Sequence, residues 1–261
     1  MQRGAAPSTL KTMSIPNTDP TLVHEARIDL AACLRMAARL GLAEGICNHF
    51  SLMVPGRDDL FLVNPDGYAF AEARASRLLV CDFEGRVVEG EGVPEDTAFF
   101  IHARIHKNVP RARACFHTHM PYATALAITE GEPFDWAVQS QLKFYGRTVI
   151  DPVYNGLALD NDEGDRIAAA IGNADIVFMA NHGVTVVGPD VASAWDDLYY
   201  LERAAEAQVK AGQSGRKILR GDPAMVKATA SIMRSGERHR ARLHLESVKR
   251  QLAVTDPDFM S

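Results

Sequence analysis

Two histidines separated by a single residue, His117 and His119, are the part of this sequence best suited to chemistry. They follow the apolar run Ala114–Phe116, which is typical of a short buried strand. Because side chains alternate along a strand, both imidazoles project from the same face. Two neutral imidazoles that project together from a strand end form half of a metal site.

A third histidine occupies a comparable place further along the chain. The segment Asn181-His182-Gly183 lies between two more apolar runs, residues 176–180 and 183–187. If these strands neighbour the first one, the three histidines converge on one point. Three protein ligands leave a coordination position open, and this distinguishes a catalytic zinc site from a structural one.

The other histidines carry weaker signals. His102 and His106 are four residues apart on an expected helix, a spacing that can bind a metal and that helical packing explains equally well. His24, His239 and His244 are isolated, and we interpret them as surface or core residues without a ligand role.

The composition is that of an ordinary globular chain. Its 261 residues suffice for one large domain or two small ones, with 47% hydrophobic and 23% charged residues. The formal net charge of −5 gives no indication of nucleic-acid binding. No apolar run reaches the length of about 18 residues that suggests a membrane span. Residues 1–20 are expected to form a loose arm, and they lack the apolar middle region of a secretory signal.

The four cysteines are scattered, without a C-x-x-C pair, at Cys33, Cys47, Cys81 and Cys115. Each has apolar neighbours, which predicts buried free thiols rather than disulfides or a cysteine metal site. Free thiols are typical of a reducing compartment, so we expect a cytoplasmic protein.

Hydrophobic periodicity and turn residues divide the chain into helices and strands. Helices are expected over residues 20–40, from 95, from 121, over 161–171 and 190–210, and in a last region over 222–252. Strands are expected over 50–54, 60–63, 78–82, 86–88, 114–117, 148–152, 176–180 and 183–187. The sequence therefore predicts one α/β domain over residues 21–212, with a mainly antiparallel sheet between helices, and a C-terminal helical extension over 213–261.

Four short motifs occur in a characteristic order: Asn48-His49-Phe50-Ser51, Asn64-Pro65-Asp66-Gly67, His117-Thr118-His119 and Asn181-His182-Gly183-Val184. With this combination the chain resembles the class II aldolase/adducin family over about residues 22–212. The segment Tyr199–Ala204 is similar to a late helix of that family.

The resemblance implies an αβα sandwich and usually a homotetramer with active sites at subunit boundaries. It also implies that His117, His119 and His182 bind a divalent metal, usually Zn²⁺ and sometimes Mn²⁺. The family motifs suggest small-molecule substrate contacts from Asn48, Ser51, Asp66, Gly67 and Thr97.

The chain departs from the sugar-phosphate aldolases of the family where those enzymes hold the substrate phosphate. Their Gly-Asn-x-Ser corresponds to residues 48–51, and their Ser-Ser-Glu corresponds to Asp96-Thr97-Ala98. A carboxylate at Asp96 would repel a phosphate, which favours a non-phosphorylated substrate. Ala98 replaces the family's catalytic glutamate and cannot transfer a proton. In these respects the chain resembles the adducin-like and decarboxylase-like branches.

We therefore expect a divalent-metal-dependent lyase that cleaves a C–C bond of a small hydroxy or keto acid, by aldol cleavage or decarboxylation. Both reactions leave an enolate, whose charge the metal would stabilise. Without a glutamate at position 98, the candidates for proton transfer are His49, Asp96, Tyr145 and a metal-bound water. Glu202 is expected either to orient a metal histidine or to lie exposed on the late helix.

Two other functions remain open at this point. An adducin-like scaffold would keep the fold without the chemistry; the missing glutamate favours it and the three histidines oppose it. A metal-dependent sugar epimerase uses the same kind of metal site, but the lost phosphate contacts count against it. Residues 216–250 hold ten Lys and Arg against three acidic residues, which suits an anionic partner or a solvated helix packed on an acidic neighbouring subunit. No aromatic residue interleaves these charges, so we expect no nucleic-acid binding.

Overall fold

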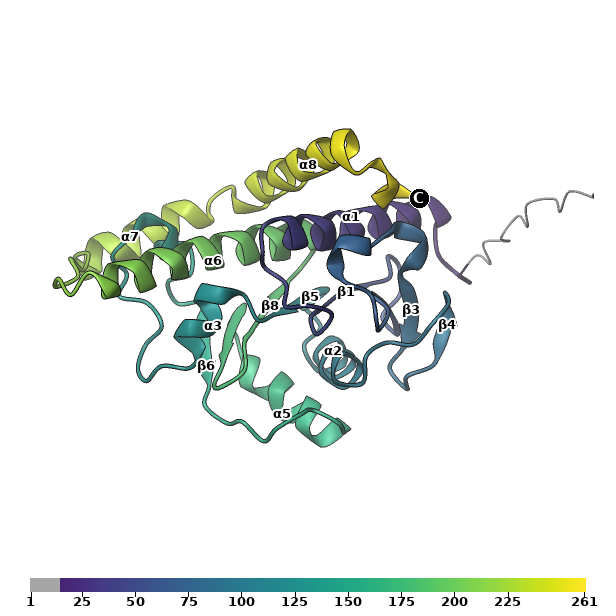
Figure 1. Cartoon of the computed structure of the whole chain (residues 1–261), viewed down its shortest axis with the longest axis horizontal. Coiled ribbons are helices and arrows are strands. Elements are labelled where there is room, and N and C mark those ends of the chain that lie inside the picture. The colour runs from purple at the N-terminus through teal and green to yellow at the C-terminus, as the bar shows by residue number, and fades with distance from the viewer. Residues whose placement is uncertain (1–14) are drawn as a thin grey trace, which may run out of the picture.

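One eight-stranded sheet, with the order β4-β3-β2-β1-β5-β8-β7-β6, forms the centre of the computed structural model (Figure 1). The structure describes residues 15–261, so most of the arm expected over residues 1–20 lies outside the described residues. The strands are β1 His49–Met53, β2 Leu60–Val63, β3 Leu79–Asp82, β4 Val87–Glu89, β5 Ala114–Thr118, β6 Thr148–Asp151, β7 Ile176–Met179 and β8 Val184–Gly188. Among the strands of residues 15–261, β6 and β7 alone pair in parallel, and this confirms the prediction of a mainly antiparallel sheet.

The longer helices agree in place with the sequence prediction as far as residue 213. The helix bounds are α1 Pro20–Arg39, α2 Asp96–Asn108, α3 Pro121–Ala127, α4 Gln139–Leu142, α5 Asn161–Ile171, α6 Val191–Gln213, α7 Pro223–Arg234 and α8 Glu237–Thr255. Three short 3-10 turns complete the described chain: η1 Phe70–Glu72, η2 Ala75–Arg77 and η3 Pro257–Met260.

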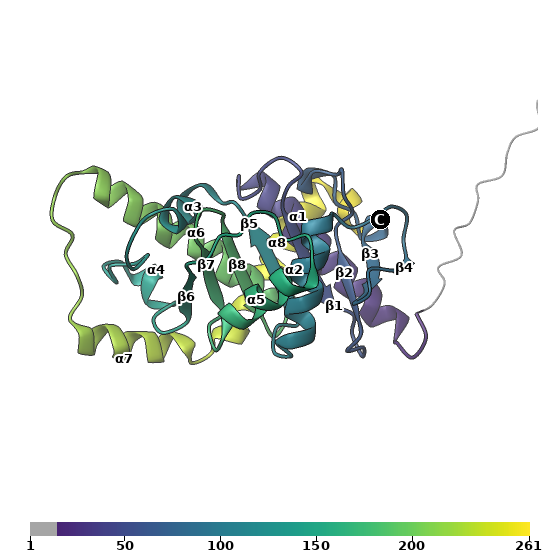
Figure 2. The ribbon, with the colours of Figure 1, turned by 90° about the horizontal axis from the view of Figure 1, so that it is seen from below.

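The sheet separates two layers of helices, as expected for an αβα sandwich. Helices α2 and α5 lie on one face, and α1 and α6 lie on the other (Figures 1 and 2). Strand alternation assigns residues to these faces. Phe50 and Phe116 stack in the core beneath α1 and α6, with ring centroids 4.1 Å apart. His49, Ser51 and His117 therefore project from the opposite face, toward α2.

Helix α2 starts where the sequence predicts it, because local groups satisfy its first amides. The Glu95 carboxylate accepts a hydrogen bond from the backbone N–H of Ala98, which satisfies a donor that the helix itself leaves free. The hydroxyl of Thr97 donates to the same carboxylate. This N-cap fixes the helix on the sheet and so determines where the side chains one and two turns later meet β1.

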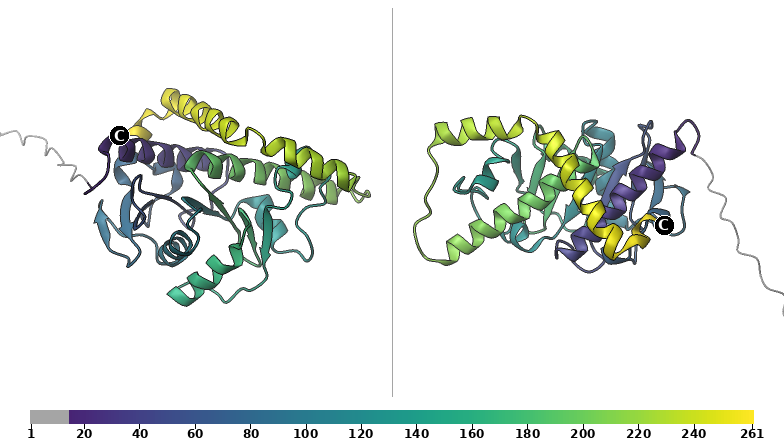
Figure 3. Two further views of the ribbon diagram at one scale, coloured as in Figure 1. Left: turned by 180° about the vertical axis from the view of Figure 1, so that it is seen from behind. Right: turned by 90° about the horizontal axis from the view of Figure 1, so that it is seen from above.

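The C-terminal helices form a further layer outside the sandwich. Helix α8 packs across α1 and α6 (Figure 3), and its Leu245, Val248 and Leu252 are buried. The sequence predicts one helical region over residues 222–252, whereas the structure has two helices. They are separated at Gly236, which adopts a left-handed φ of 79° that glycine tolerates without steric cost.

A buried ion cluster fastens the start of α8 to the domain. The ammonium of Lys143 lies 2.8 Å from a carboxylate oxygen of Asp196, 2.9 Å from Asp197 and 2.5 Å from Glu237. Arg147 contacts Asp197 and Glu237 as well. Because these acids surround both cations, they raise the pKa of Lys143 and Arg147 despite the opposing effect of burial. Replacing one charged residue of this cluster by a neutral one would leave an excess of buried charge.

The cysteines correct one prediction. Cys33, Cys81 and Cys115 are buried free thiols as predicted, but Cys47 is exposed, because it lies in the irregular segment before β1 rather than in an element. Within residues 15–261, no helix combines the length and the apolar character that crossing a membrane requires.

Candidate metal centre

Three histidines from two neighbouring strands meet at one end of the sheet. His117 lies on β5, His119 follows that strand directly, and His182 lies in the turn between β7 and β8. The antiparallel pairing of β5 with β8 sets Thr118 opposite Val184, so the end of one strand adjoins the start of the other. One ring nitrogen of each histidine lies within 4.8 Å of the corresponding atoms of the other two.

The geometry of these nitrogens fits a divalent metal. The Nε2 atoms of His117 and His119 are 3.2 Å apart, close to the spacing of about 3.3 Å between ligands in a tetrahedral zinc site with Zn–N bonds of about 2.0–2.1 Å. The Nδ1 atoms of these two rings, on the side away from the cluster, each contact another side chain. His117 Nδ1 lies 3.2 Å from the hydroxyl of Thr185, whose own proton points to the sulfur of Met179. Such outer contacts fix the tautomer that leaves Nε2 free for a metal.

Burial keeps two of these imidazoles, those of His117 and His182, in the neutral form that binds metals. Loss of water around the ring, with a smaller repulsion from His119, lowers the pKa of His182 to about 4. Burial, followed by repulsion from the neighbouring histidines, also lowers the pKa of His117 well below its usual range. Both rings are therefore neutral near pH 7, which is the state that donates a lone pair.

A glycine allows the turn that carries His182 to approach His119. A Cβ atom on Gly183 would lie 2.7 Å from Cδ2 of His119 and 2.7 Å from the carbonyl oxygen of Thr118. The preceding Asn181 has a positive φ of 56°, a conformation that asparagine adopts more readily than most residues. The positive φ before His182 therefore suits asparagine, and the close approach after it requires glycine.

Glu44 is a site residue that the sequence analysis missed. Its carboxylate lies 2.6 Å from Nδ1 of His119, and it comes from the irregular segment between α1 and β1. The side-chain oxygen of Asn48 accepts the backbone N–H of Glu44 at 2.7 Å and that of His119 at 3.5 Å. No local pattern marks an acidic residue in a loop as a partner of a histidine 75 positions away, so only the fold identifies it.

His49 lies directly beside the cluster. It is the register partner of His117 across β1 and β5, and the two rings stack with centroids 4.9 Å apart. Burial, and then repulsion from other histidines, lowers the pKa of His49 to about 3. His102 and His106 of α2 are absent from the three-histidine cluster and lie in a hydrogen-bonded network beneath His49. Ser51 is fully buried in this network.

Two proposed substrate-contact segments lie around the same end of β1. Asn64 ties the turn after β2 to β1, because its side chain accepts from the N–H of Phe50 and donates to the carbonyl of Asn48. In that turn Asp66 is exposed and Gly67 has a φ of 78°. The other segment is the first turn of α2, where Asp96 is exposed and the hydroxyl of Thr97 is bonded to the N-cap carboxylate.

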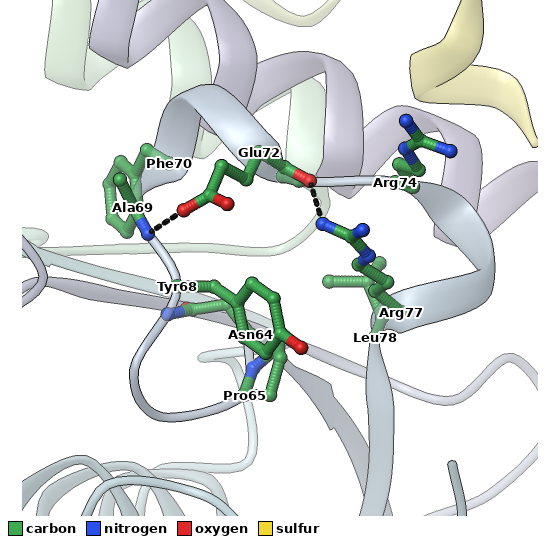
Figure 4. A pocket seen from close by; sticks show the side chains of 10 residues that line it. Asn64, Pro65, Tyr68, Ala69, Phe70, Glu72, Arg74, Arg77 and Leu78 are labelled. Carbon is green, nitrogen blue, oxygen red and sulfur yellow. Dashed lines mark hydrogen bonds between the residues drawn. The ribbon is translucent and has the colours of Figure 1, made fainter. Parts of the chain in front are cut away.

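A small hollow beside the turn after β2 is separate from the histidines (Figure 4). Its volume of about 10 Å³ is room for at most one water-sized group. The guanidinium of Arg77 lies 5.0 Å from the ring centroid of Tyr68 and donates to the carbonyl of Glu72. The hollow is therefore too small to hold a substrate.

Two candidate residues do not contact the three-histidine cluster. Tyr145 precedes β6, whereas His182 follows β7, which runs parallel to β6, so the two are at opposite ends of the sheet. Glu202, expected to orient a metal histidine or lie exposed, does neither. It is buried, and its two oxygens accept the N–H groups of Tyr122 and Ala123 at 2.9 Å each, which caps the start of α3.

The model of the Class II Aldolase and Adducin N-terminal domain matches residues 28–209, a range that includes all three histidines of the cluster. The chain belongs to the class II aldolase and adducin family. This confirms the family inferred from the four motifs and the fold that it implies.

Relatives within the class II aldolase and adducin family carry several functional names. A Caulobacter vibrioides protein, named provisionally as an aldolase class 2 protein, is 34% identical over 217 residues, which cover 81% of this chain and 82% of that protein. Decarboxylase NovR of Streptomyces niveus is 28% identical over 207 residues, which cover 77% of this chain and 76% of that protein. The crystal structure of an aldolase II superfamily protein from Pseudomonas syringae superimposes with a TM-score of 0.87 at 28% identity. The match covers 94% of this chain and 98% of that one.

Proposed function

We propose that this chain is a divalent-metal-dependent lyase that cleaves a C–C bond of a small, non-phosphorylated hydroxy or keto acid. The observation that carries the proposal is the cluster of three imidazoles, each with a ring nitrogen within 4.8 Å of those of the other two. Thr185 and Glu44 support it, because they bind the outer nitrogens of two of these rings. Zn²⁺ is the metal that three imidazoles suit best, with Mn²⁺ as the other candidate.

The residues of the site divide into three roles. His117, His119 and His182 would hold the metal, which when bound acts as a Lewis acid on substrate oxygens and stabilises the negative charge of the breaking C–C bond. His49, stacked on His117, is the proposed group for proton transfer. Asn48 fixes the loop that carries Glu44 over the centre.

The charge around the proposed substrate site supports a substrate without phosphate. Asp96 is exposed in the first turn of α2, where a helix N-terminus would otherwise attract an anion. Its carboxylate opposes a phosphate electrostatically. We propose that the exposed turn of Asp66 and Gly67 and the start of α2 contact the substrate. Tyr145, at the far end of the sheet, could serve only the site of another copy.

An adducin-like scaffold is the competing function, and one observation favours it. Ala98 is fully buried one turn before His102 and carries no group that transfers protons. A scaffold, however, has no need for three convergent imidazoles with partners on their outer nitrogens. The two functions therefore differ in whether the purified protein holds a metal.

Metal analysis tests the proposed function. The native protein, supplied with stoichiometric zinc and dialysed, is expected to retain about one metal per chain. His117→Ala and His182→Ala are expected to lose most of it, and the matched control His24→Ala, at an exposed position on α1, is expected to retain it. Aldehyde and carbon dioxide release from hydroxy and keto acids then identify the reaction. A native protein without metal, or ligand variants with full metal, would contradict the proposal.

We further propose that the chain forms a homotetramer through the surface next to His182. Three apolar residues follow β6 and are 45%, 50% and 69% exposed: Val153, Tyr154 and Leu157. The ring of Tyr154 lies 6.2 Å from that of His182, so this apolar surface borders the metal centre. Light scattering on the native protein and on Leu157→Glu measures the assembly; a monomeric native protein would refute this part of the proposal.

A further inference from the structure

A continuous row of hydrogen bonds runs beneath the metal centre, from β1 to α2. His49 Nδ1 lies 2.6 Å from Nε2 of His102. The hydroxyl of Ser51 contacts Nδ1 of His102 and lies 2.7 Å from Nε2 of His106. The row ends at the backbone carbonyl of Ala112, 2.7 Å from Nδ1 of His106. All four side chains are at least 95% buried.

The end of the row determines the direction of every bond in it. A carbonyl oxygen only accepts, so the proton of His106 resides on Nδ1, and its Nε2 is left with a lone pair. Burial lowers the pKa of His106 to about 4 and that of His102 well below its usual range, so both rings are neutral. The Ser51 hydroxyl must then donate to Nε2 of His106, since its alternative acceptor, the Cys115 carbonyl, is 3.4 Å away.

The same reasoning continues toward the metal centre. Because the single hydroxyl proton of Ser51 is already used, its oxygen accepts from Nδ1–H of His102. The Nε2 atom of His102 then has a lone pair and accepts from Nδ1–H of His49. Neutral His49 is left with a lone pair on Nε2, and no described residue hydrogen-bonds to that atom.

We propose that His102, Ser51 and His106 are positioning residues that lock His49 in the tautomer protonated on Nδ1, with Nε2 as an acceptor beside His117. The row is not a route for protons out of the site, because the Ala112 carbonyl at its end cannot take one up. It is a clamp on the tautomer and orientation of one ring.

This polarity also specifies the substrate group that faces His49, and here the inference rests on the proposed lyase function. An acceptor pairs with a donor, so the substrate presents a hydroxyl. In the step that follows, the hydroxyl proton passes to Nε2 and the O–H electron pair forms the new carbonyl. The adjacent C–C bond breaks with its electrons on the product enolate, which then takes the proton back from His49. The structure thus favours β-hydroxy carbonyl compounds over keto acids that only lose carbon dioxide.

Nitrogen NMR of the zinc-loaded protein labelled with ¹⁵N-histidine tests the clamp directly. Magic-angle-spinning spectra distinguish protonated from unprotonated ring nitrogens, and a His49→Gln sample identifies the signals of His49 by their loss. We expect His49, His102 and His106 all to carry the proton on Nδ1. A His49 ring protonated on Nε2 in the native protein would overturn the proposal, whatever the variants do.

Ser51→Ala removes the centre of the row and is the decisive variant. We expect His49 to change from one tautomer to a mixture, with the Nδ1–H population reduced roughly twofold or more because the fixed donor and acceptor are lost. Ser193→Ala, a half-buried serine on α6, serves as the matched control and is expected to leave the spectrum unchanged. An unaltered His49 tautomer in folded Ser51→Ala would overturn the clamp.

Substrate pairs separate this inference from the proposed function. A 4-hydroxy-2-oxo acid is expected to be cleaved to an aldehyde and a 2-oxo acid roughly 100-fold faster than a matched β-keto acid loses carbon dioxide. The reverse preference would overturn the hydroxyl assignment and leave the metal-dependent lyase intact. A protein that holds no metal would refute the proposed function, while the tautomer of His49 would still be measured independently.

Discussion

Replacing Gly183 by alanine tests how far the proposed metal centre depends on a close approach between a turn and a strand. The new Cβ atom would lie 2.7 Å from both the ring of His119 and the carbonyl of Thr118, where ordinary contacts begin near 3.4 Å. A displacement of about 0.7 Å is therefore required, which is large for a close-packed interior. Gly183 is not one of the glycines with positive φ, so the alanine brings steric conflict without backbone strain.

The size of the loss in stability and in metal affinity depends on which neighbouring group moves. Thr118 belongs to the central strand β5 and pairs with Val184, so its carbonyl is held by the sheet. A shift of the His119 ring, which contacts Glu44, relieves only one of the two close contacts, so the turn that carries His182 must also move away from Thr118. Overpacking of this kind costs about 1–3 kcal/mol of folding free energy. Loss of the contact that orients a metal histidine typically weakens metal binding about 10- to 100-fold.

Two measurements check this prediction: urea unfolding of the metal-free protein, and zinc affinity from competition with a chromophoric chelator. The matched control is Gly212→Ala in α6, where a Cβ atom meets nothing within 4 Å. The control is expected to keep the zinc affinity and to gain about 0.5–1 kcal/mol of stability. A Gly183→Ala protein with native stability and native zinc affinity would refute the reasoning.

Three further changes have defined expectations. Glu44→Gln is expected to weaken zinc binding roughly 10- to 100-fold, because a neutral amide is a poorer acceptor for His119; an unchanged affinity in the chelator titration would contradict this. Lys143→Met removes the ammonium that three carboxylates share and leaves Arg147 to face Asp197 and Glu237. The change is expected to cost about 3–5 kcal/mol in urea unfolding, and a loss below about 1 kcal/mol would make the ion cluster dispensable. Burial lowers the pKa of His106 from 6.5 to about 4. The unfolded state therefore binds a proton first, and His106 by itself should lower the unfolding free energy by about 3 kcal/mol as the pH drops from about 6.5 to about 4. The other buried histidines add to this fall, so His106→Gln should make the slope shallower without removing it, and an equally steep slope in the variant would exclude a contribution from His106.

The sequence predicts those parts of the site that depend on local order. His117 and His119 stand out because strand alternation places them on one face, and the turn residues around His182 mark the start of a neighbouring strand. The strands, the long helices and their relative direction follow from periodicity and from turn chemistry. The family motifs add which of the nine histidines belong together.

The remainder depends on how elements dock, and short-range patterns do not contain that information. The row beneath His49 exists because α2 packs against β1. The four-residue spacing of His102 and His106 on α2 is equally typical of ordinary helix packing, so the sequence alone does not predict the row. Glu44 lies in a segment without regular structure, and its contact with His119 spans 75 positions. Glu202 was expected either to orient a metal histidine or to lie exposed, yet its carboxylate is buried and accepts two backbone N–H groups at the start of α3.

The packing of α8 over α1 has a consequence for how the chain acquires its fold. Arg35 of α1 binds Asp258 at 2.8 Å, across 223 positions of sequence, and Lys249 of α8 binds Asp29 at the same distance. The first helix therefore finds its outer partner only after the 223 positions that separate Arg35 from Asp258 have been synthesised. Contacts of such long range slow folding, since a large loop must close before they form. A nascent chain therefore exposes apolar surface of α1 on the ribosome until α8 emerges, and during that interval it is a natural client for chaperones.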